Sequence, residues 1–253
     1  SFVIFYLLSV LSNKKDLNYL SHIIFFLIFY LLFVVIFWPY LWNDPLNKLI
    51  EAFSIMSNFR WGGYNLYFGE YILGSNLPWH YIPVWISITT PIFYLFLFIY
   101  GFLHISLRFK KRFFNITNET DTRDLLSGDN ELIDLVHYII FILPIFLVIS
   151  LNSTLYDGWR HLYFVYPSFL YISLKGLYLI KINFYRYKPR KLFSITVMFL
   201  LFISWDMFQY HPHQNVYFNF LAGKNIEKKF ELDYWGLSNK QAYEYILNND
   251  SDD

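Results

Sequence analysis

The sequence predicts an all-α fold, a polytopic bundle of transmembrane helices with extracytoplasmic loops, and three observations lead to this prediction. First, 56% of the residues are hydrophobic and 24% are aromatic, whereas only 15% are charged, so polar side chains could not cover a soluble domain of 253 residues. Second, five segments are apolar over the roughly 20 residues that a helix needs to cross a bilayer. Third, basic residues gather in alternate connections between these segments.

The predicted helix bundle covers residues 1–210, and a short extracytoplasmic tail follows at 211–253. An apolar partial helix at 1–11 comes first, with no initiator methionine, basic leader or cleavage site. We therefore expect the chain to be an N-terminally truncated fragment that begins inside a membrane helix. The predicted spans then lie at about 19–41, 82–107, 135–151, 162–180 and 192–210.

Lysine and arginine occupy every second connection. The basic side chains are Lys14 and Lys15, then Arg108, Lys110, Lys111 and Arg112, and then Lys181, Arg186, Lys188, Arg190 and Lys191. Cytoplasmic loops carry such an excess of positive charge, so these connections are expected in the cytoplasm. The outer connections at 42–81 and 152–161 and the tail would then face the other side, which is the periplasm if the chain lies in a bacterial inner membrane.

The outer connection at 42–81 is long enough to contain structure of its own. Asn43 or Asp44 can cap a helix that has Pro45 in its first turn. Apolar residues then recur on one face, which predicts a helix lying on the membrane surface. Residues 64–71 are rich in aromatic side chains and are expected to be strand-like or irregular.

Two further segments are expected to be peripheral. Residues 109–134 are polar, mixed in charge and without periodicity, which predicts a flexible cytoplasmic connector. In the tail, Ser238 and Gln241 have the spacing of a capping box and predict a small terminal helix.

Candidate functional side chains concentrate in the outer loop at 156–161, which has the sequence YDGWRH. Arg160 can grip a phosphate with its guanidinium fork, His161 can share a phosphate oxygen, and Trp159 can stack on a sugar ring. The loop therefore suits an anion or a sugar. An aromatic belt with an internal ion pair between Asp157 and Arg160 would give the same pattern.

Other polar residues near the membrane admit simpler interpretations. Trp79, His80 and Tyr81 form a second aromatic and imidazole group at the same depth, and such residues are also typical of the membrane interface. Lys175 lies near the basic end of its predicted span, where it can snorkel to the surface. Asp206 lies near the outer end of the last span and is expected to be an interfacial carboxylate.

Several kinds of chemistry are excluded or disfavoured. The chain has no cysteine, which excludes disulfides, thiolate metal sites and a cysteine nucleophile. It contains no glycine-rich phosphate loop, serine elbow or zinc-binding histidine pair on a helix. His211 and His213 with Asp206 match no strong ligand spacing, so neither a metal nor a cofactor is predicted. A formal net charge of +1 gives no reason to expect a nucleic-acid partner.

Four motifs in order resemble the later half of bacterial GT-C glycosyltransferases related to protein O-mannosyltransferases, from about Trp38 to the end of the chain. They are WPYLW at 38–42, LPWHYIP at 77–83, YDGWRH at 156–161 followed by YP at 166–167, and FELDYWG at 230–236.

This resemblance implies a GT-C-like inverting enzyme that takes a sugar from a polyprenyl-phosphate donor and places it on a protein, lipid or glycan acceptor outside the cytoplasm. It also implies that the general base is an acidic residue in a loop upstream of Ser1. The matched positions would supply the donor side, and Asp233 would be a candidate for acceptor contact. The resemblance assigns Arg160 and His161 to the donor phosphate and assigns the substrate cavity to Trp79, His80, Tyr81, Asp157 and Trp159.

Two other functions remain open at this stage. A transporter would normally place charged residues or broken helices at mid-membrane, whereas the predicted spans are mostly bare of charge. A non-catalytic membrane subunit would also match the composition. In each case the expected environment includes membrane lipid.

Overall fold

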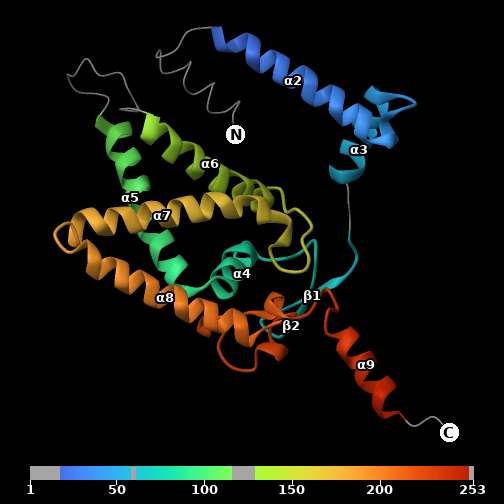
Figure 1. Cartoon of the computed structure of the whole chain (residues 1–253). Coiled ribbons are helices and arrows are strands. Elements are labelled where there is room, and N and C mark those ends of the chain that lie inside the picture. Colours follow the sequence, from blue (N-terminus) through green and yellow to red (C-terminus); the bar gives the residue numbers. More distant parts are fainter. Residues whose placement is uncertain (1–17, 58–60, 116–128, 251–253) are drawn as a thin grey trace. The chain divides into compact units, whose positions relative to one another are not determined.

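The computed structural model describes residues 18–57, 61–115 and 129–250 (Figure 1). The chain divides into two compact units. The first unit comprises Ser1–Arg60 and Leu107–Ile140, and the second comprises Trp61–Ser106 and Phe141–Asp253. The described residues are mostly helical, as predicted, and the predicted partial helix at 1–11 lies outside them.

The first unit opens with α2 (Asn18–Phe37), which is followed by the short helix η1 (Pro39–Leu41) and by α3 (Pro45–Ser57). The backbone N–H of Asn47 donates to the carboxylate of Asp44 at 3.3 Å, so Asp44 caps α3 as the sequence predicts. Leu46, Ile50 and Phe53 of α3 are 75%, 66% and 67% exposed. An apolar face so exposed is what a helix lying on a membrane surface presents.

Three described helices are long and apolar enough to cross a membrane. They are α5 (Ile92–Asn115), α6 (Asp129–Ser150) and α8 (Pro189–Gln209), and they match three of the predicted spans. The chain therefore has the helices of an integral membrane protein. The remaining predicted spans fall on helices that are shorter or less apolar, namely α2, in which the described apolar stretch is Ile24–Phe37, and α7 (Tyr166–Phe184).

The prediction of one continuous helix over 82–107 is wrong. The structure divides this segment into α4 (Tyr81–Thr89) and α5, and the break falls at Thr90 and Pro91. Proline has no backbone N–H and disfavours helical geometry in the residue before it, and Thr90 is accordingly extended, with φ −103° and ψ 137°. The break makes α4 a separate short helix, whose first residue is Tyr81.

The prediction of a flexible connector at 109–134 is wrong at both ends. Helix α5 continues to Asn115 and α6 begins at Asp129. Within the first unit, Arg108 donates to the buried carboxylate of Asp134 at 2.8 Å. The polar residues thus extend the two helices beyond their apolar parts.

In the second unit, α5 and α7 cross at two glycines. A Cβ on Gly101 would lie 2.9 Å from the backbone nitrogen of Gly176, and a Cβ on Gly176 would overlap the carbonyl oxygen of Leu97. Phe98 of α5 stacks on Phe169 of α7, with ring centroids 4.5 Å apart. Glycine at the crossing therefore allows the backbones to approach closely, as is common in membrane bundles.

An antiparallel hairpin of β1 (Tyr64–Tyr67) and β2 (Glu70–Leu73) forms the strand-like segment that the sequence predicts. Tyr67 also forms an isolated antiparallel bridge with Phe230, so the tail pairs with the hairpin. The tail contains the short helices η3 (Gln214–Val216), η4 (Phe220–Ala222) and η5 (Ile226–Lys228), and then α9 (Asn239–Asn249).

Helix α9 confirms the predicted terminal helix, but the predicted capping box is wrong. The hydroxyl of Ser238 donates to Asp233 at 2.6 Å, and its side chain makes no cap on α9. The side chain of Gln241 contacts Nε2 of His213 at 3.0 Å. Both side chains thus make hydrogen bonds within the tail.

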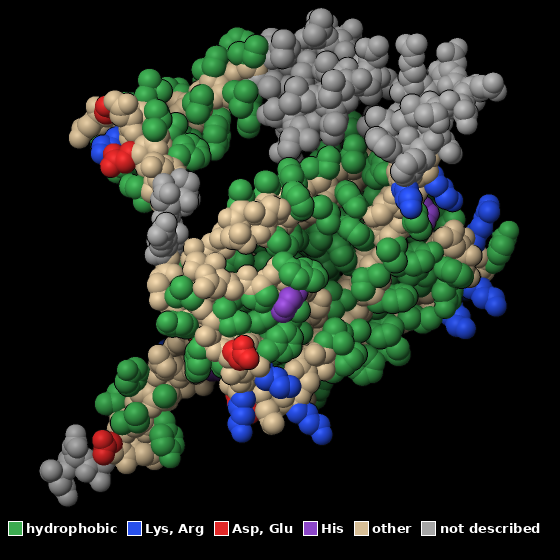
Figure 2. Space-filling view, turned by 180° about the vertical axis from the view of Figure 1, so that it is seen from behind, with side chains coloured by type: hydrophobic (Ala, Val, Ile, Leu, Met, Phe, Trp, Pro, Cys, Tyr) green, Lys and Arg blue, Asp and Glu red, His purple; other side chains and the backbone are tan. Residues whose placement is uncertain are grey.

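The surface of α8 is strongly apolar. No residue of α8 is buried, and Leu201 and Phe202 are 65% and 60% exposed. In Figure 2, hydrophobic side chains cover most of the visible surface, and Lys and Arg lie toward its edges. Such a surface is favourable in lipid and unfavourable in water.

Candidate functional site

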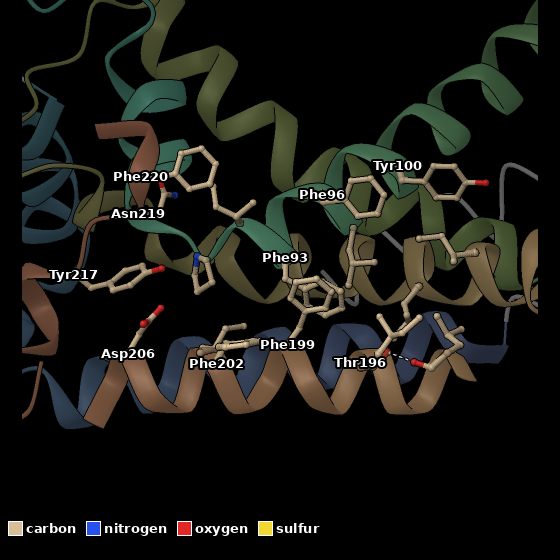
Figure 3. Close-up of a pocket in the computed structure, with 18 of the residues that line it drawn as sticks. Phe93, Phe96, Tyr100, Thr196, Phe199, Phe202, Asp206, Tyr217, Asn219 and Phe220 are labelled. Carbon is tan, nitrogen blue, oxygen red and sulfur yellow. Dashed lines mark hydrogen bonds between the residues drawn. The ribbon is translucent and has the colours of Figure 1, made fainter. Parts of the chain in front are cut away.

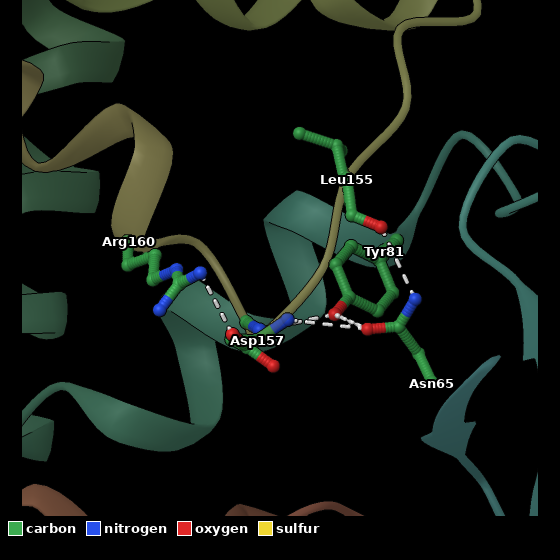
Figure 4. Close-up of polar contacts among 6 residues, drawn as sticks. Asn65, Tyr81, Leu155, Asp157 and Arg160 are labelled. Atoms are coloured by element: carbon green, nitrogen blue, oxygen red, sulfur yellow. Dashed lines mark hydrogen bonds and ion pairs between the residues drawn. The ribbon is translucent and has the colours of Figure 1, made fainter. Parts of the chain in front are cut away.

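The frame of the site is a hydrogen-bond network around Asn65, which lies in β1 and is 1% exposed (Figure 4). Its amide nitrogen donates to the carbonyl oxygen of Leu155 at 3.1 Å. Its Oδ1 accepts from the hydroxyl of Tyr81 at 3.3 Å and from the backbone N–H of Asp157 at 3.2 Å. One buried amide therefore joins the hairpin, the start of α4 and the loop at 155–158.

The backbone of the loop is held in an uncommon conformation. Asp157 and Gly158 have φ values of +55° and +72°, and a positive φ is unfavourable for aspartate. The N–H of Asp157 donates to Asn65, and the N–H of Gly158 donates to the hydroxyl of Tyr81 at 3.1 Å. The surrounding network thus holds the strained turn and fixes where the side chain of Asp157 projects.

Arg160 is the central cation of the site. Its Nη2 lies 2.9 Å from a carboxylate oxygen of Asp157, and its side chain is 20% exposed. Its guanidinium carbon lies 4.6 Å from the ring centroid of Tyr156, 4.7 Å from that of Trp235 and 5.7 Å from that of Tyr234. An arginine so surrounded is pre-organised, because aromatic faces and one carboxylate hold its planar fork.

His161 lies beside Arg160 and packs edge-on against Tyr156, with ring centroids 4.5 Å apart. Tyr156 in turn stacks on Trp61 at 4.7 Å. Desolvation lowers the pKa of His161, and the positive charge of Arg160 lowers it further. These effects favour the neutral imidazole, which carries one N–H that can donate to an anion.

Glu231 is a residue of the site that the sequence analysis does not nominate. It follows Phe230, which is 1% exposed and whose backbone bridges to Tyr67. Burial and the nearby charge of Asp157 raise the pKa of Glu231. Burial also raises the pKa of Asp157, which Arg160 partly opposes. The carboxylates of Glu231 and Asp157 thus lie close enough to influence each other, and Asp157 is the one that pairs with Arg160.

Replacing Glu231 with glutamine is expected to stabilise the protein at neutral pH. The raised pKa means that the folded state favours the protonated acid, so this contribution to stability is full below the unfolded-state pKa and is lost as the pH rises through the folded-state pKa. Glutamine does not ionise, so the variant does not lose this stability as the pH rises. Thermal unfolding at about pH 4 and about pH 8 should show the variant gaining on the native protein as the pH rises. Glu227→Gln, at an exposed position of the same tail, should show no such gain.

A cavity of about 450 Å³ opens beside this cluster. Trp159 lines it and donates from Nε1 to the hydroxyl of Thr89 at 3.0 Å. The Oδ1 atom of Asn215, which also lines it, is buried and accepts no hydrogen bond from the described part of the chain. Aromatic faces and a free amide acceptor suit a sugar ring with hydroxyl groups. The aromatic walls are Trp85, Tyr94, Trp159, Tyr163, Tyr166, Tyr217, Phe218 and Tyr234.

The structure does not bring all the predicted site residues together. The contacts given above connect Tyr81, Asp157, Arg160 and His161, and Trp159 lines the cavity beside them. Trp79 is 69% exposed and does not line the cavity of about 450 Å³. His80 lies away from that cavity too, and its Nδ1 contacts the hydroxyl of Tyr67 at 2.6 Å. These two residues are neighbours of Tyr81 in sequence, but their side chains point to other partners.

Asp233 has a clear role within the tail. Its carboxylate accepts from the hydroxyl and the N–H of Ser238 at 2.6 and 2.8 Å, from the N–H of Leu237 at 3.1 Å and from the amide of Asn215 at 3.1 Å. These bonds lower the pKa of Asp233 to about 2. The carboxylate therefore fixes the turn that precedes α9, and its lone pairs are largely used there.

The described residues contain no group of three or more His, Asp or Glu side chains that could hold a metal ion. Of the histidines in the tail, His211 contacts the amide of Gln214 at 3.0 Å. No family model, curated protein or solved structure matches the chain. The function must therefore be inferred from the chemistry of the site.

Proposed function

We propose that this chain is a membrane glycosyltransferase that moves a sugar from a polyprenyl-phosphate donor to an acceptor outside the cytoplasm. Its described residues are assigned the donor side of that reaction. Arg160 and His161 bind the donor phosphate, and the adjacent aromatic cavity receives the sugar.

The observation that carries the proposal is the guanidinium of Arg160, held by aromatic rings at the border of the cavity. The cavity is lined by Gly158, Trp159 and Tyr234. Arg160 follows Trp159 in the chain, and its guanidinium carbon lies 5.7 Å from the ring centroid of Tyr234. A phosphate at this point would meet the charged fork, while the sugar that it carries would meet Trp159 and the free oxygen of Asn215.

The same arrangement would favour the chemistry of transfer. When the bond between the sugar and the phosphate breaks, negative charge develops on the departing phosphate. A cation that is already in place stabilises this charge without reorganisation, and partial exclusion of water strengthens the effect. The guanidinium of Arg160 is only 20% exposed and is already held by Asp157 and aromatic rings, so it meets both conditions.

The membrane helices support a lipid-linked donor. A polyprenyl chain must remain in hydrocarbon while its phosphate meets water and cations, and a site at the end of membrane-spanning helices offers both. The basic turn between α7 and α8 contains Arg186 and Lys188, which the positive-inside rule assigns to the cytoplasm. The site would then face the opposite side, as an acceptor outside the cytoplasm requires.

Replacing Arg160 with alanine is expected to weaken binding of a polyprenyl phosphate by at least about tenfold, which is the loss for one charge-assisted contact of roughly 1.4 kcal/mol or more. Farnesyl phosphate and farnesol serve as probes that differ only in the phosphate. Titration of the full chain in detergent, followed by tryptophan fluorescence, should show the loss for farnesyl phosphate and no change for farnesol. Arg160→Lys, which keeps the charge but not the fork, should be intermediate.

Arg186→Ala is the matched control, because Arg186 is exposed in the turn between α7 and α8 and should leave both affinities unchanged. An equal loss for farnesol, or no loss for farnesyl phosphate, would reject the role of Arg160. Incubation with a sugar-loaded polyprenyl phosphate and an acceptor then tests transfer itself. Binding without any release of polyprenyl phosphate would instead indicate a non-catalytic subunit that recognises the lipid.

A further inference from the structure

A second and larger cavity, of about 1020 Å³, lies between α8 and the helices α5 and α7 (Figure 3). Its walls are almost entirely apolar along its length. They include Phe93 and Phe96 from α5, Leu177 from α7, and Phe199 and Phe202 from α8. A volume and a lining of this kind suit a hydrocarbon chain.

The cavity exists because α8 packs loosely. No residue of α8 is buried, and its clearest aromatic contact with α5 is the stack of Phe199 on Phe93, with centroids 4.6 Å apart and planes 8° apart. Water inside an apolar cavity has few hydrogen-bond partners, whereas a lipid chain gains dispersion contacts with every wall. In a bilayer, a lipid chain is therefore the favoured occupant.

One end of the cavity is acidic. Asp206 projects into it from α8, and Figure 3 shows its carboxylate facing the hydroxyl end of Tyr217. The rings of Tyr217 and Tyr210 pack edge to face at 5.7 Å, and both line the cavity. Among the described residues, no Lys, Arg or His side chain forms an ion pair with Asp206.

The neighbouring amide of Asn219 is held by hydrogen bonds within the protein. Its nitrogen donates to the carbonyl oxygens of Ser87 and Thr90, each at 2.7 Å. Its oxygen accepts from the N–H of Leu221 at 2.8 Å. Asp206 is thus the charged group that a ligand head at this end would meet, and Tyr210 and Tyr217 line the cavity beside it.

We propose that this cavity binds one chain of a membrane lipid whose head group carries an ammonium, and that the ammonium lies against Asp206, Tyr210 and Tyr217. A carboxylate and aromatic faces together recognise such a cation, through charge and through the negative face of the rings. An anionic head group at the same place would be repelled by Asp206. This site is separate from the donor site and does not depend on the glycosyltransferase proposal.

The two cavities nevertheless share part of their walls. Pro91, Ile203, Tyr217 and Phe218 line both of them. A lipid bound against Asp206 would therefore support residues that also shape the cavity assigned to the sugar.

The test compares phosphatidylethanolamine with N-acetyl-phosphatidylethanolamine of identical chains, because acetylation removes only the ammonium. The full chain is purified in detergent, incubated with an equal mixture of the two lipids, and analysed by native mass spectrometry. The native protein should retain phosphatidylethanolamine about tenfold over its acetylated form. Asp206→Asn should abolish this preference, and Asp250→Asn, an exposed aspartate near the C-terminus, should preserve it.

A second variant tests where the chain lies. Thr196 lines the cavity away from its Asp206 end, and Thr196→Trp would block part of the path of the lipid chain, so retention of both lipids should fall about tenfold or more. Equal retention of the two lipids by the native protein would overturn the proposal. So would an Asp206→Asn protein that still prefers phosphatidylethanolamine, or a Thr196→Trp protein that retains both lipids normally.

Discussion

Replacing Gly176 with alanine is expected to destabilise the second unit by roughly 3 kcal/mol, which is a large effect for a single methyl group. The added Cβ would overlap the carbonyl oxygen of Leu97 and would lie 3.1 Å from the backbone nitrogen of Gly101. Both obstacles are backbone atoms of α5, so no side chain can turn aside to make room. The two helices would have to separate, and the stack of Phe98 on Phe169 would loosen with them.

Thermal unfolding in detergent measures this effect. Gly62→Ala is the matched control, since a Cβ on Gly62 would meet no atom within 4 Å and should leave the melting temperature nearly unchanged. Equal melting temperatures for Gly176→Ala and Gly62→Ala would show that α5 and α7 do not cross at these glycines.

Replacing Asn65 with leucine is expected to cost roughly 3 kcal/mol and to disable the loop that carries Arg160. The variant loses bonds to Leu155, Tyr81 and Asp157, and it leaves the buried carbonyl oxygen of Leu155 without this donor. The strained turn at Asp157 would then have less to hold it. Leucine has the same number of side-chain heavy atoms as asparagine and leaves no cavity, so lost hydrogen bonds rather than lost volume cause the change.

Two measurements check this prediction. The melting temperature should fall, and the affinity for farnesyl phosphate should fall even at temperatures where the variant remains folded. Asn76→Leu, at an exposed position after the hairpin, should change neither quantity appreciably. A normal affinity in a folded Asn65→Leu protein would mean that the network does not position Arg160.

The long helices could be predicted from the sequence because membrane spans require long apolar runs, which hydropathy detects directly. The break at Pro91 could not be predicted in the same way. Both α4 and α5 are apolar, so 82–107 has the composition of a single span. Only the backbone shows that Thr90 is extended and that Tyr81 belongs to a separate helix.

The candidate site was predictable where its residues are close in sequence. Asp157, Arg160 and His161 lie within one loop, and the possible ion pair between the first two is present at 2.9 Å. Asn65 lies about 90 residues before the loop, and no sequence pattern connects the two. Glu231 lies within the motif at 230–236, but the sequence does not show that it comes near Asp157. An asparagine in an aromatic strand also has the pattern of a surface residue, whereas the structure buries it.

The hydrogen bonds that the carboxylate of Asp233 accepts determine how the tail responds to acid. A pKa of about 2 keeps this carboxylate ionised in mildly acidic solution, so the turn into α9 retains its bonds to Ser238. Burial raises the pKa values of Asp157 and Glu231, so these carboxylates take up protons before Asp233 does during acidification. On acidification the ion pair between Asp157 and Arg160 is therefore expected to weaken before the turn into α9 loses its bonds.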